Sequence, residues 1–156
     1  NEATLFVDTS DMTVHDVRDK LVTTFSGGKG KLALTIMSFG FKHGLPLNAD
    51  LVFDVRFLPN PHFVAELRPL TGKDEAVATY VLDRDDTQTF VSKIEDLLGF
   101  LLPRYDAEGK AYITVAIGCT GGRHRSVAIA EHLAEKAESM GRNVTVRHRD
   151  AGVDPK

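Results

Sequence analysis

Residues 112–126 read YITVAIGCTGGRHRS, and this stretch decides the fold. It opens with an apolar run that is typical of a central strand covered on both faces. The glycine-rich segment after it has the composition of a tight loop. From His124 onward apolar residues return at helical spacing until Gly141, a residue type that suits the position just past a helix end. The sequence therefore predicts a strand, a loop and a helix in succession.

A strand, a small-residue loop and a helix in this order form an anion-binding geometry. Backbone N–H groups converge at the start of the helix, where the helix dipole adds partial positive charge. Arg125 is able to engage two phosphate oxygens at once, and His124 adds charge below about pH 6.5. We therefore expect a phosphate group to bind this loop. The expected contacts are Thr120, Gly121, Gly122, Arg123, His124, Arg125 and Ser126.

The same loop is compatible with a catalytic alternative. Five residues separate Cys119 from Arg125, which is the spacing of cysteine-dependent phosphatases, whose thiolate attacks phosphorus. Such an enzyme also needs a leaving-group acid, for which Asp54 and Asp83 are candidates. Against this, Gly118 stands where those enzymes usually carry a histidine. A tight turn with a buried cysteine is the third interpretation.

The rest of the chain alternates strand and helix patterns. Strands are predicted over 31–39, 52–58 and 143–148, and a long helix between 71 and 109, capped by Asp86 or Thr87. The apolar stripe of this helix is Phe90, Ile94, Leu97, Leu98 and Leu101. This order favours a single α/β domain with a mixed sheet and flanking helices, whose ligands sit beyond the carboxyl ends of the strands.

The first thirty residues differ from the rest. Apolar residues at helical spacing over 14–25 predict a short helix, which the glycine and lysine cluster at 26–31 ends. We divide the chain into an N-terminal linker helix over 1–30, a main domain over 31–150 and a tail over 151–156. Because the chain starts at Asn1 rather than Met, we expect a piece of a longer protein.

Composition limits the function classes. The 156 residues are 42% apolar and 26% charged, an ordinary globular balance, and the net charge of −3 is not that of a typical nucleic-acid binder. A single cysteine and the absence of a long apolar run favour the cytoplasm and no membrane association. Scattered histidines predict no metal site, and no Walker motif is present, so no cofactor is expected.

Polar side chains also gather where two other strands end. Lys42 and His43 lie between glycines and form either a functional rim or a solvated turn. Asp54 and Arg56 belong either to a ligand site or to an internal ion-pair network. His62, at a strand end, is assigned to a ligand contact rather than to simple packing.

Four ordered motifs resemble the C-terminal domain of the RapZ family of RNase adapter proteins. They are SFGFKHG at 38–44, FDVRFLPNPH at 53–62, LRPLTG at 67–72 and VAIGCTGGRHRS at 115–126. The resemblance extends over about residues 32–149. Residues 5–25 resemble the end of the preceding nucleotide-binding domain of that family, whose Walker motif this sequence lacks.

The resemblance implies a regulatory domain rather than an enzyme, with a fold like part of a phosphofructokinase. It implies self-association as a homodimer and a pocket that senses glucosamine 6-phosphate. It also implies that the domain binds small regulatory RNA and presents it to a ribonuclease, which controls the synthesis of amino sugars and cell-envelope precursors. Beside the loop, the implied ligand residues are Arg56, His62 and Thr71. The implied RNA contacts are Lys42, His43, Arg68, His124, Arg125, Arg142, Arg147 and Arg149.

The C-terminal tail departs from the family pattern. RNA-binding members end in a cluster of lysines and arginines, whereas this chain ends DAGVDPK. The difference removes about three phosphate contacts, each of which lowers the salt-dependent part of the affinity. We therefore expect sugar-phosphate sensing first, and RNA binding only where Arg142, Arg147 and Arg149 compensate.

Overall fold

The computed structural model describes residues 32–152. The elements are β1 (Ala33–Gly40), η2 (Phe41–His43), β2 (Leu51–Asp54), η3 (Pro61–Phe63), α2 (Glu75–Leu82), α3 (Asp85–Glu108), β3 (Tyr112–Cys119), α4 (Arg125–Ser139) and β4 (Asn143–His148). The strand, loop and helix predicted around residues 112–126 are confirmed as β3, residues 120–124 and α4. The helix predicted over 14–25 and the tail from residue 153 lie outside the described residues.

The strands form a four-stranded sheet in the order β2-β3-β1-β4. The predicted α/β class is confirmed, but every pairing within residues 32–152 is parallel, so the expected mixed sheet is wrong. The reason is the connection over residues 41–50, which crosses from the carboxyl edge of the sheet back to its amino edge. There the amide of Asp50 donates to the carbonyl of Thr114 at 2.8 Å, and β2 then runs in the direction of β1.

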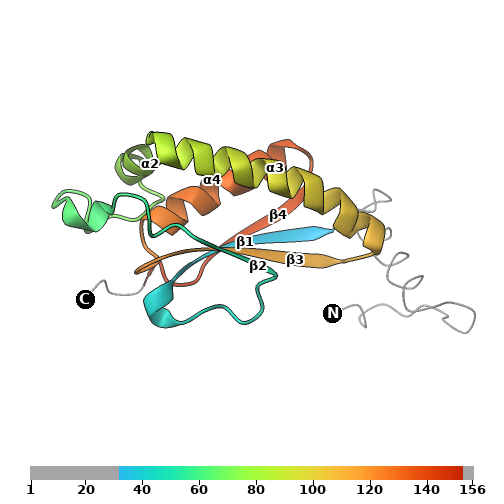
Figure 1. The fold of residues 1–156 in the computed structure, drawn as a ribbon. Coiled ribbons are helices and arrows are strands. Elements are labelled where there is room, and N and C mark those ends of the chain that lie inside the picture. Colours follow the sequence, from blue (N-terminus) through green and yellow to red (C-terminus); the bar gives the residue numbers. More distant parts are fainter. Residues whose placement is uncertain (1–31, 153–156) are drawn as a thin grey trace, which may run out of the picture.

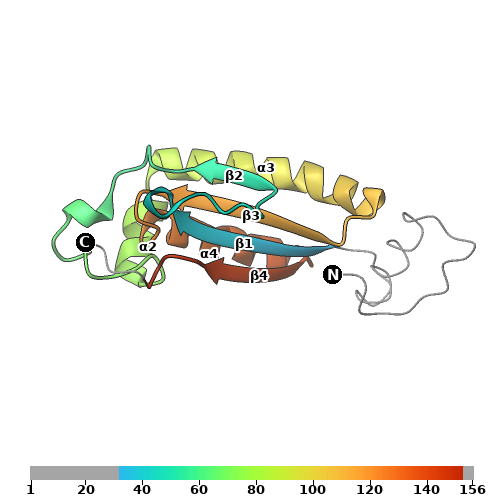
Figure 2. The ribbon, with the colours of Figure 1, turned by 90° about the horizontal axis from the view of Figure 1, so that it is seen from below.

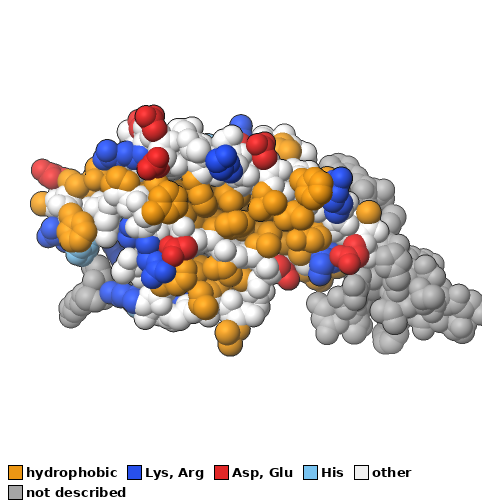
Figure 3. Space-filling view, in the orientation of Figure 1, with side chains coloured by type: hydrophobic (Ala, Val, Ile, Leu, Met, Phe, Trp, Pro, Cys, Tyr) orange, Lys and Arg blue, Asp and Glu red, His pale blue; other side chains and the backbone are white. Residues whose placement is uncertain are grey.

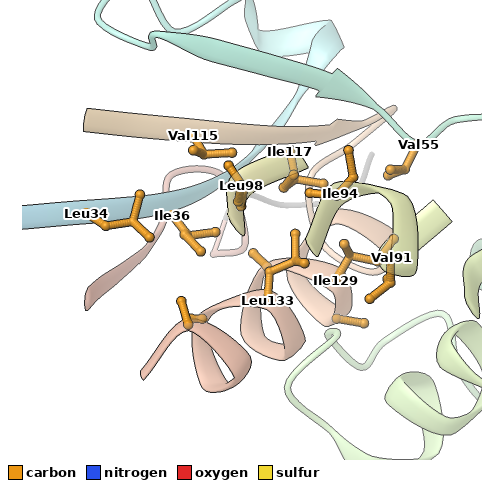
Figure 4. Packing of buried hydrophobic residues seen from close by; sticks show 14 of the residues in the cluster. Leu34, Ile36, Val55, Val91, Ile94, Leu98, Val115, Ile117, Ile129 and Leu133 are labelled. Atoms are coloured by element: carbon orange, nitrogen blue, oxygen red, sulfur yellow. The ribbon is translucent and has the colours of Figure 1, made fainter. Parts of the chain in front are cut away.

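The three α-helices cover one face of the sheet (Figure 1), while the strands lie nearest the viewer on the other (Figure 2). The core lies between helices and sheet and is formed by alternate residues of β1 and β3 with apolar residues of α3 and α4 (Figure 4). Those residues include Leu34, Ile36, Ile94, Leu98, Val115, Ile117, Ile129 and Leu133, none more than 6% exposed. Packing of α4 on β1, β3 and β4 fixes where the loop before it lies.

The helical region between 71 and 109 divides into α2 and α3. At 24 residues α3 is the longest helix described, as predicted, but it begins at Asp85 with Arg84 as its N-cap and no capping side chain. Thr87 is buried within the first turn instead of capping it. Leu97 is 37% exposed, so this member of the predicted stripe faces away from the core.

β2 is shorter than predicted, and this changes how Arg56 is placed. The amide of Val55 donates to the carbonyl of Gly118 at 2.9 Å, and the amide of Leu58 donates back to Val55 at 3.2 Å. The chain therefore turns after Asp54, and Arg56 lies on that turn rather than on a strand. No helix within residues 32–152 is long and apolar enough to cross a membrane.

Candidate functional site

A cavity of about 350 Å³ lies where β1 and β3 end and α4 begins. One wall is the loop between β3 and α4, and the other is the turn around η3. Lining residues are Lys42, Asn60, His62, Phe63, Cys119, Thr120, Gly121, Arg123, His124 and Arg125. The volume falls at the lower end of small-molecule pockets, which hold about 300–1,000 Å³. The cavity therefore has room for more than a bare anion.

Close backbone contact between β1 and the loop depends on glycine. Gly122 has φ of +80°, and a Cβ there would lie 2.5 Å from the amide nitrogen of Gly40. A Cβ on Gly40 would in turn lie 2.4 Å from the carbonyl carbon of Gly121. Larger side chains at positions 40 and 122 would therefore separate β1 from the loop.

Behind this contact lies a carboxylate that the sequence analysis did not identify. Asp150 is 5% exposed and accepts hydrogen bonds from the amide of Gly40 at 2.7 Å and from Arg149 at 2.8 Å. Burial alone would raise the pKa of Asp150, but these hydrogen bonds outweigh it and hold the pKa below its usual value. A single aspartate two residues after β4 forms no recognisable sequence motif. Only its place close to the end of that strand could have indicated this role.

Arg125 is the most deeply buried cation of the cavity, with 3% of its surface exposed. One terminal nitrogen donates to the carbonyls of Arg56 at 2.9 Å and Leu58 at 3.0 Å, and the other donates to the Thr120 hydroxyl at 3.3 Å. The predicted grip on two phosphate oxygens is therefore revised, because one terminal nitrogen already holds the turn after β2. The other terminal nitrogen lies on the loop side.

Arg125 forms no ion pair within residues 32–152, although its charge is close enough to Asp54 to help lower the pKa of that carboxyl. The Nε of Arg125 is buried without a hydrogen-bond partner. The first-turn amides of any α-helix lack partners within the helix. In α4 the N-cap residue, His124, supplies no capping side chain for them. A buried unpaired cation and an uncapped helix start both favour a bound anion.

His124 is 6% exposed, and its Nε2 lies 3.2 Å from the carbonyl of Arg68. Burial lowers the pKa of His124, and the neighbouring Arg123 charge acts in the same direction, against the opposing effect of backbone carbonyls. His124 therefore gains its charge at a lower pH than the ordinary value of about 6.5. In its neutral form His124 serves as a hydrogen-bonding wall.

The catalytic alternative depends on Cys119, which is 2% exposed with its Sγ 3.1 Å from the Ser126 hydroxyl. The Ser126 hydroxyl is buried as well, and Cys119 also lines the cavity. Arg56 donates to both carboxylate oxygens of Asp54, at 2.7–3.1 Å, and this hydrogen bonding lowers the pKa of Asp54. A carboxyl with a lowered pKa is a poor leaving-group acid. The other candidate acid, Asp83, follows the last residue of α2 and is not among the residues that line the cavity.

Several predicted ligand residues lie outside the cavity lining. The Arg56 guanidinium pairs with Asp54 and stacks 4.0 Å from the centroid of the Phe41 ring, which supports the internal-network interpretation. The Thr71 hydroxyl accepts from the amide of Lys73 at 3.2 Å, just before α2. Gly122 lies behind the loop, against β1.

The predicted RNA contacts do not form one cluster. Arg142 pairs with Asp106 at 2.6 Å, at the amino end of the sheet and away from the cavity. Arg147 is exposed on β4, and Arg149 donates to the carbonyl of Gly44 at 2.6 Å. Lys42 lines the cavity, the adjacent His43 of η2 is exposed, and Arg68 donates to the His62 carbonyl at 2.7 Å.

Arg123 donates to backbone carbonyls of two other segments. Its guanidinium donates to Ala151 at 2.7 Å and to Pro69 at 3.1 Å, while its own carbonyl accepts from the amide of Gly72 at 2.8 Å. It therefore holds two distant segments against the loop. No group of histidine, cysteine, aspartate and glutamate within the described range is placed to hold a metal ion.

Comparison of the sequence with known proteins shows the family to which the chain belongs. The family model described as "RapZ C-terminal domain" matches residues 32–152, which span all the described elements. The chain belongs to the RapZ C-terminal domain family. It is 57% identical over 132 residues to a nucleotide-binding protein of Bacillus velezensis, covering 84% of this chain and 45% of that protein.

Other relatives give the same result. The nucleotide-binding protein YvcJ of Bacillus subtilis is 54% identical over 132 residues, 84% of this chain and 45% of YvcJ. A nucleotide-binding protein of Anaeromyxobacter sp. (strain K) is 54% identical over 145 residues, 92% of this chain and 49% of that protein. The chain thus spans about half the length of these relatives.

Gly122→Ala should destabilise the domain, because a methyl group at φ +80° and 2.5 Å from the Gly40 nitrogen forces the loop away from β1. We expect a loss of about 1–3 kcal/mol in the free energy of unfolding, measured with urea. Gly121→Ala is the matched control, since nothing lies within 4 Å of a Cβ there. Equal losses in the two variants would contradict this account.

Asp150→Asn should reduce stability at neutral pH by about 1.5–3 kcal/mol, the usual worth of hydrogen bonds to a charged group. Because the pKa of Asp150 is lower in the folded state, its contribution is fully present above the unfolded pKa and is lost as the pH falls through the folded value. The difference between parent and variant should therefore narrow below about pH 4. Urea unfolding across pH tests this, with Asp96→Asn on the exposed side of α3 as control.

Proposed function

We propose that the domain is a regulatory sensor that binds glucosamine 6-phosphate, or a related sugar phosphate, and has no catalytic role of its own. The observation that carries the proposal is the buried Arg125 guanidinium, which forms no ion pair among the described residues and lies at the uncapped start of α4. A phosphate group would meet both needs at once. The motifs shared with the RapZ family support the choice of an amino-sugar phosphate.

The cavity wall opposite the loop supports an organic phosphate over a bare ion. Asn60 and His62 line that wall, and Lys42 lines the cavity as well. Side chains of these types hydrogen-bond hydroxyl and amine groups, which a sugar carries and inorganic phosphate lacks. A phosphate in the loop would direct the remainder of the ligand toward this wall.

The rest of the proposal concerns the longer protein. It comprises homodimer formation, binding of small regulatory RNA, presentation of that RNA to a ribonuclease, and a place in the cytoplasm. RNA contact is supported by Lys42 at the cavity and His43 beside it in η2. Lys and Arg side chains also lie at the left end of the face shown in Figure 3, the end at which η2 and η3 lie in Figure 1. RNA phosphate and sugar phosphate would then compete for the same loop.

Calorimetric titration with glucosamine 6-phosphate, glucosamine and inorganic phosphate tests the sensor. The sugar phosphate should bind more tightly than phosphate, and glucosamine should give no heat. Arg125→Lys should weaken both phosphate ligands about tenfold or more, because an ammonium group cannot hold the turn and face the anion together. Arg84→Lys, at the start of α3, is the control.

Two results would contradict the sensor. Equal weak heats from all three compounds would remove the sugar-phosphate assignment. Release of phosphate from an aryl phosphate by the parent, abolished in Cys119→Ser, would instead establish the phosphatase alternative. The sensor predicts no turnover, and Cys119→Ser should bind the sugar phosphate with unchanged affinity, provided that urea unfolding shows a folded variant.

RNA binding is tested by measuring its affinity across salt concentrations. The logarithm of the association constant should fall steeply with the logarithm of salt, and Lys42→Ala should reduce that slope by about one. Lys93→Ala on the exposed side of α3 should leave the slope unchanged. Glucosamine 6-phosphate should displace the RNA. A flat salt dependence, or no competition, would argue against a shared phosphate site.

A further inference from the structure

One aromatic side chain at the cavity serves neither the core nor the anion site. Phe63 lines the cavity, yet 78% of its surface is exposed. Its ring contact is with the imidazole of His62, edge to face, with centroids 5.7 Å apart and planes at 79°. The side chain is absent from the hydrophobic core cluster. A phenyl ring in this position contributes little burial to the folded state.

The backbone that carries Phe63 is firmly held. Its amide donates to the carbonyl of Asn60 at 3.1 Å, and the amide of His62 donates to the Asn60 side chain at 3.0 Å. The preceding Pro61 is buried, and Arg68 donates to the His62 carbonyl at 2.7 Å. The turn is therefore ordered by contacts that do not involve the phenyl ring. Because the backbone is already held, a ligand that covers the ring orders only the two side-chain torsions of Phe63.

The position of the ring suits the non-phosphate part of a ligand. The turn that carries it forms the wall opposite residues 119–125, across a cavity of about 350 Å³. A phosphate at the start of α4 occupies the loop side only, so the group attached to it extends toward the turn. The C–H face of a pyranose ring is apolar, and placing it on a phenyl ring removes both surfaces from water. An acyclic phosphate offers no such face.

We propose that Phe63 is a specificity-determining residue, the platform on which the ring of a cyclic sugar phosphate stacks. The platform makes the site prefer cyclic sugar phosphates to acyclic phosphate esters and to inorganic phosphate. This inference rests on the proposed function, since it needs the phosphate to be held by the loop. It assigns discrimination to the turn and charge recognition to the start of α4.

The test compares the parent with Phe63→Ala and Phe63→Tyr by calorimetry. The probes are glucosamine 6-phosphate, glycerol 3-phosphate and inorganic phosphate. Phe63→Ala should weaken the sugar phosphate about tenfold and leave the other two unchanged, whereas Phe63→Tyr, which keeps a ring, should bind like the parent. Phe100→Ala removes another exposed ring, which belongs to α3 and is 54% exposed, and should change nothing.

The outcomes separate this inference from the proposed function. Unchanged affinity of Phe63→Ala for the sugar phosphate, in a protein that binds all three probes, overturns the platform and leaves the anion site standing. An equal loss for all three probes also overturns it, because the residue would then act through the turn. A parent protein that binds inorganic phosphate but not the sugar phosphate also overturns the platform. A parent that binds none of them overturns both proposals.

Discussion

The buried guanidinium of Arg125 is the interaction on which the site depends. It belongs to the first turn of α4, yet it reaches the carbonyls of Arg56 and Leu58 in the turn after β2, and the Thr120 hydroxyl in the loop. Three segments far apart in sequence thus meet at one side chain. Because α4 packs along the sheet, the position of Arg125 is fixed by the core, and Arg125 in turn fixes the turn after β2 at the cavity. The fold therefore holds a buried cation that forms no ion pair within residues 32–152, and a bound anion would neutralise its charge.

A second set of contacts holds the opposite side of the loop. The Ser38 hydroxyl lies 2.7 Å from Nδ1 of His148, whose Nε2 lies 2.6 Å from a carboxylate oxygen of Glu131. These bonds tie β1, β4 and α4 together just before the chain reaches Asp150, which accepts the amide of Gly40. The end of β4 thereby positions the end of β1, and β1 contacts Gly122. Side chains that touch no ligand thus determine where the loop lies.

Much of this arrangement could be predicted from the sequence because its pattern is local. The apolar run of β3, the glycines and the spacing of α4 gave the strand, loop and helix correctly, and β4 was predicted with the bounds that the structure shows. The direction of β2 could not be predicted, since it depends on the crossing of residues 41–50. The apolar run predicted cover on both faces, but the helices within residues 32–152 all lie on one face (Figure 2). On the other face the rings of Phe39 and Phe41 pack against Gly118.

Side-chain direction was the least predictable property, and it decides the chemistry of the loop. Spacing alone places Cys119 and Arg125 as in a phosphatase, but the sulfur is buried against Ser126, while Thr120 is exposed. The contact between Cys119 and Ser126 joins β3 to the first turn of α4, although Cys119 also lines the cavity. Beside it the loop presents the Thr120 hydroxyl and one edge of the Arg125 guanidinium. Such a surface can hold an anion through donors that the fold keeps in place.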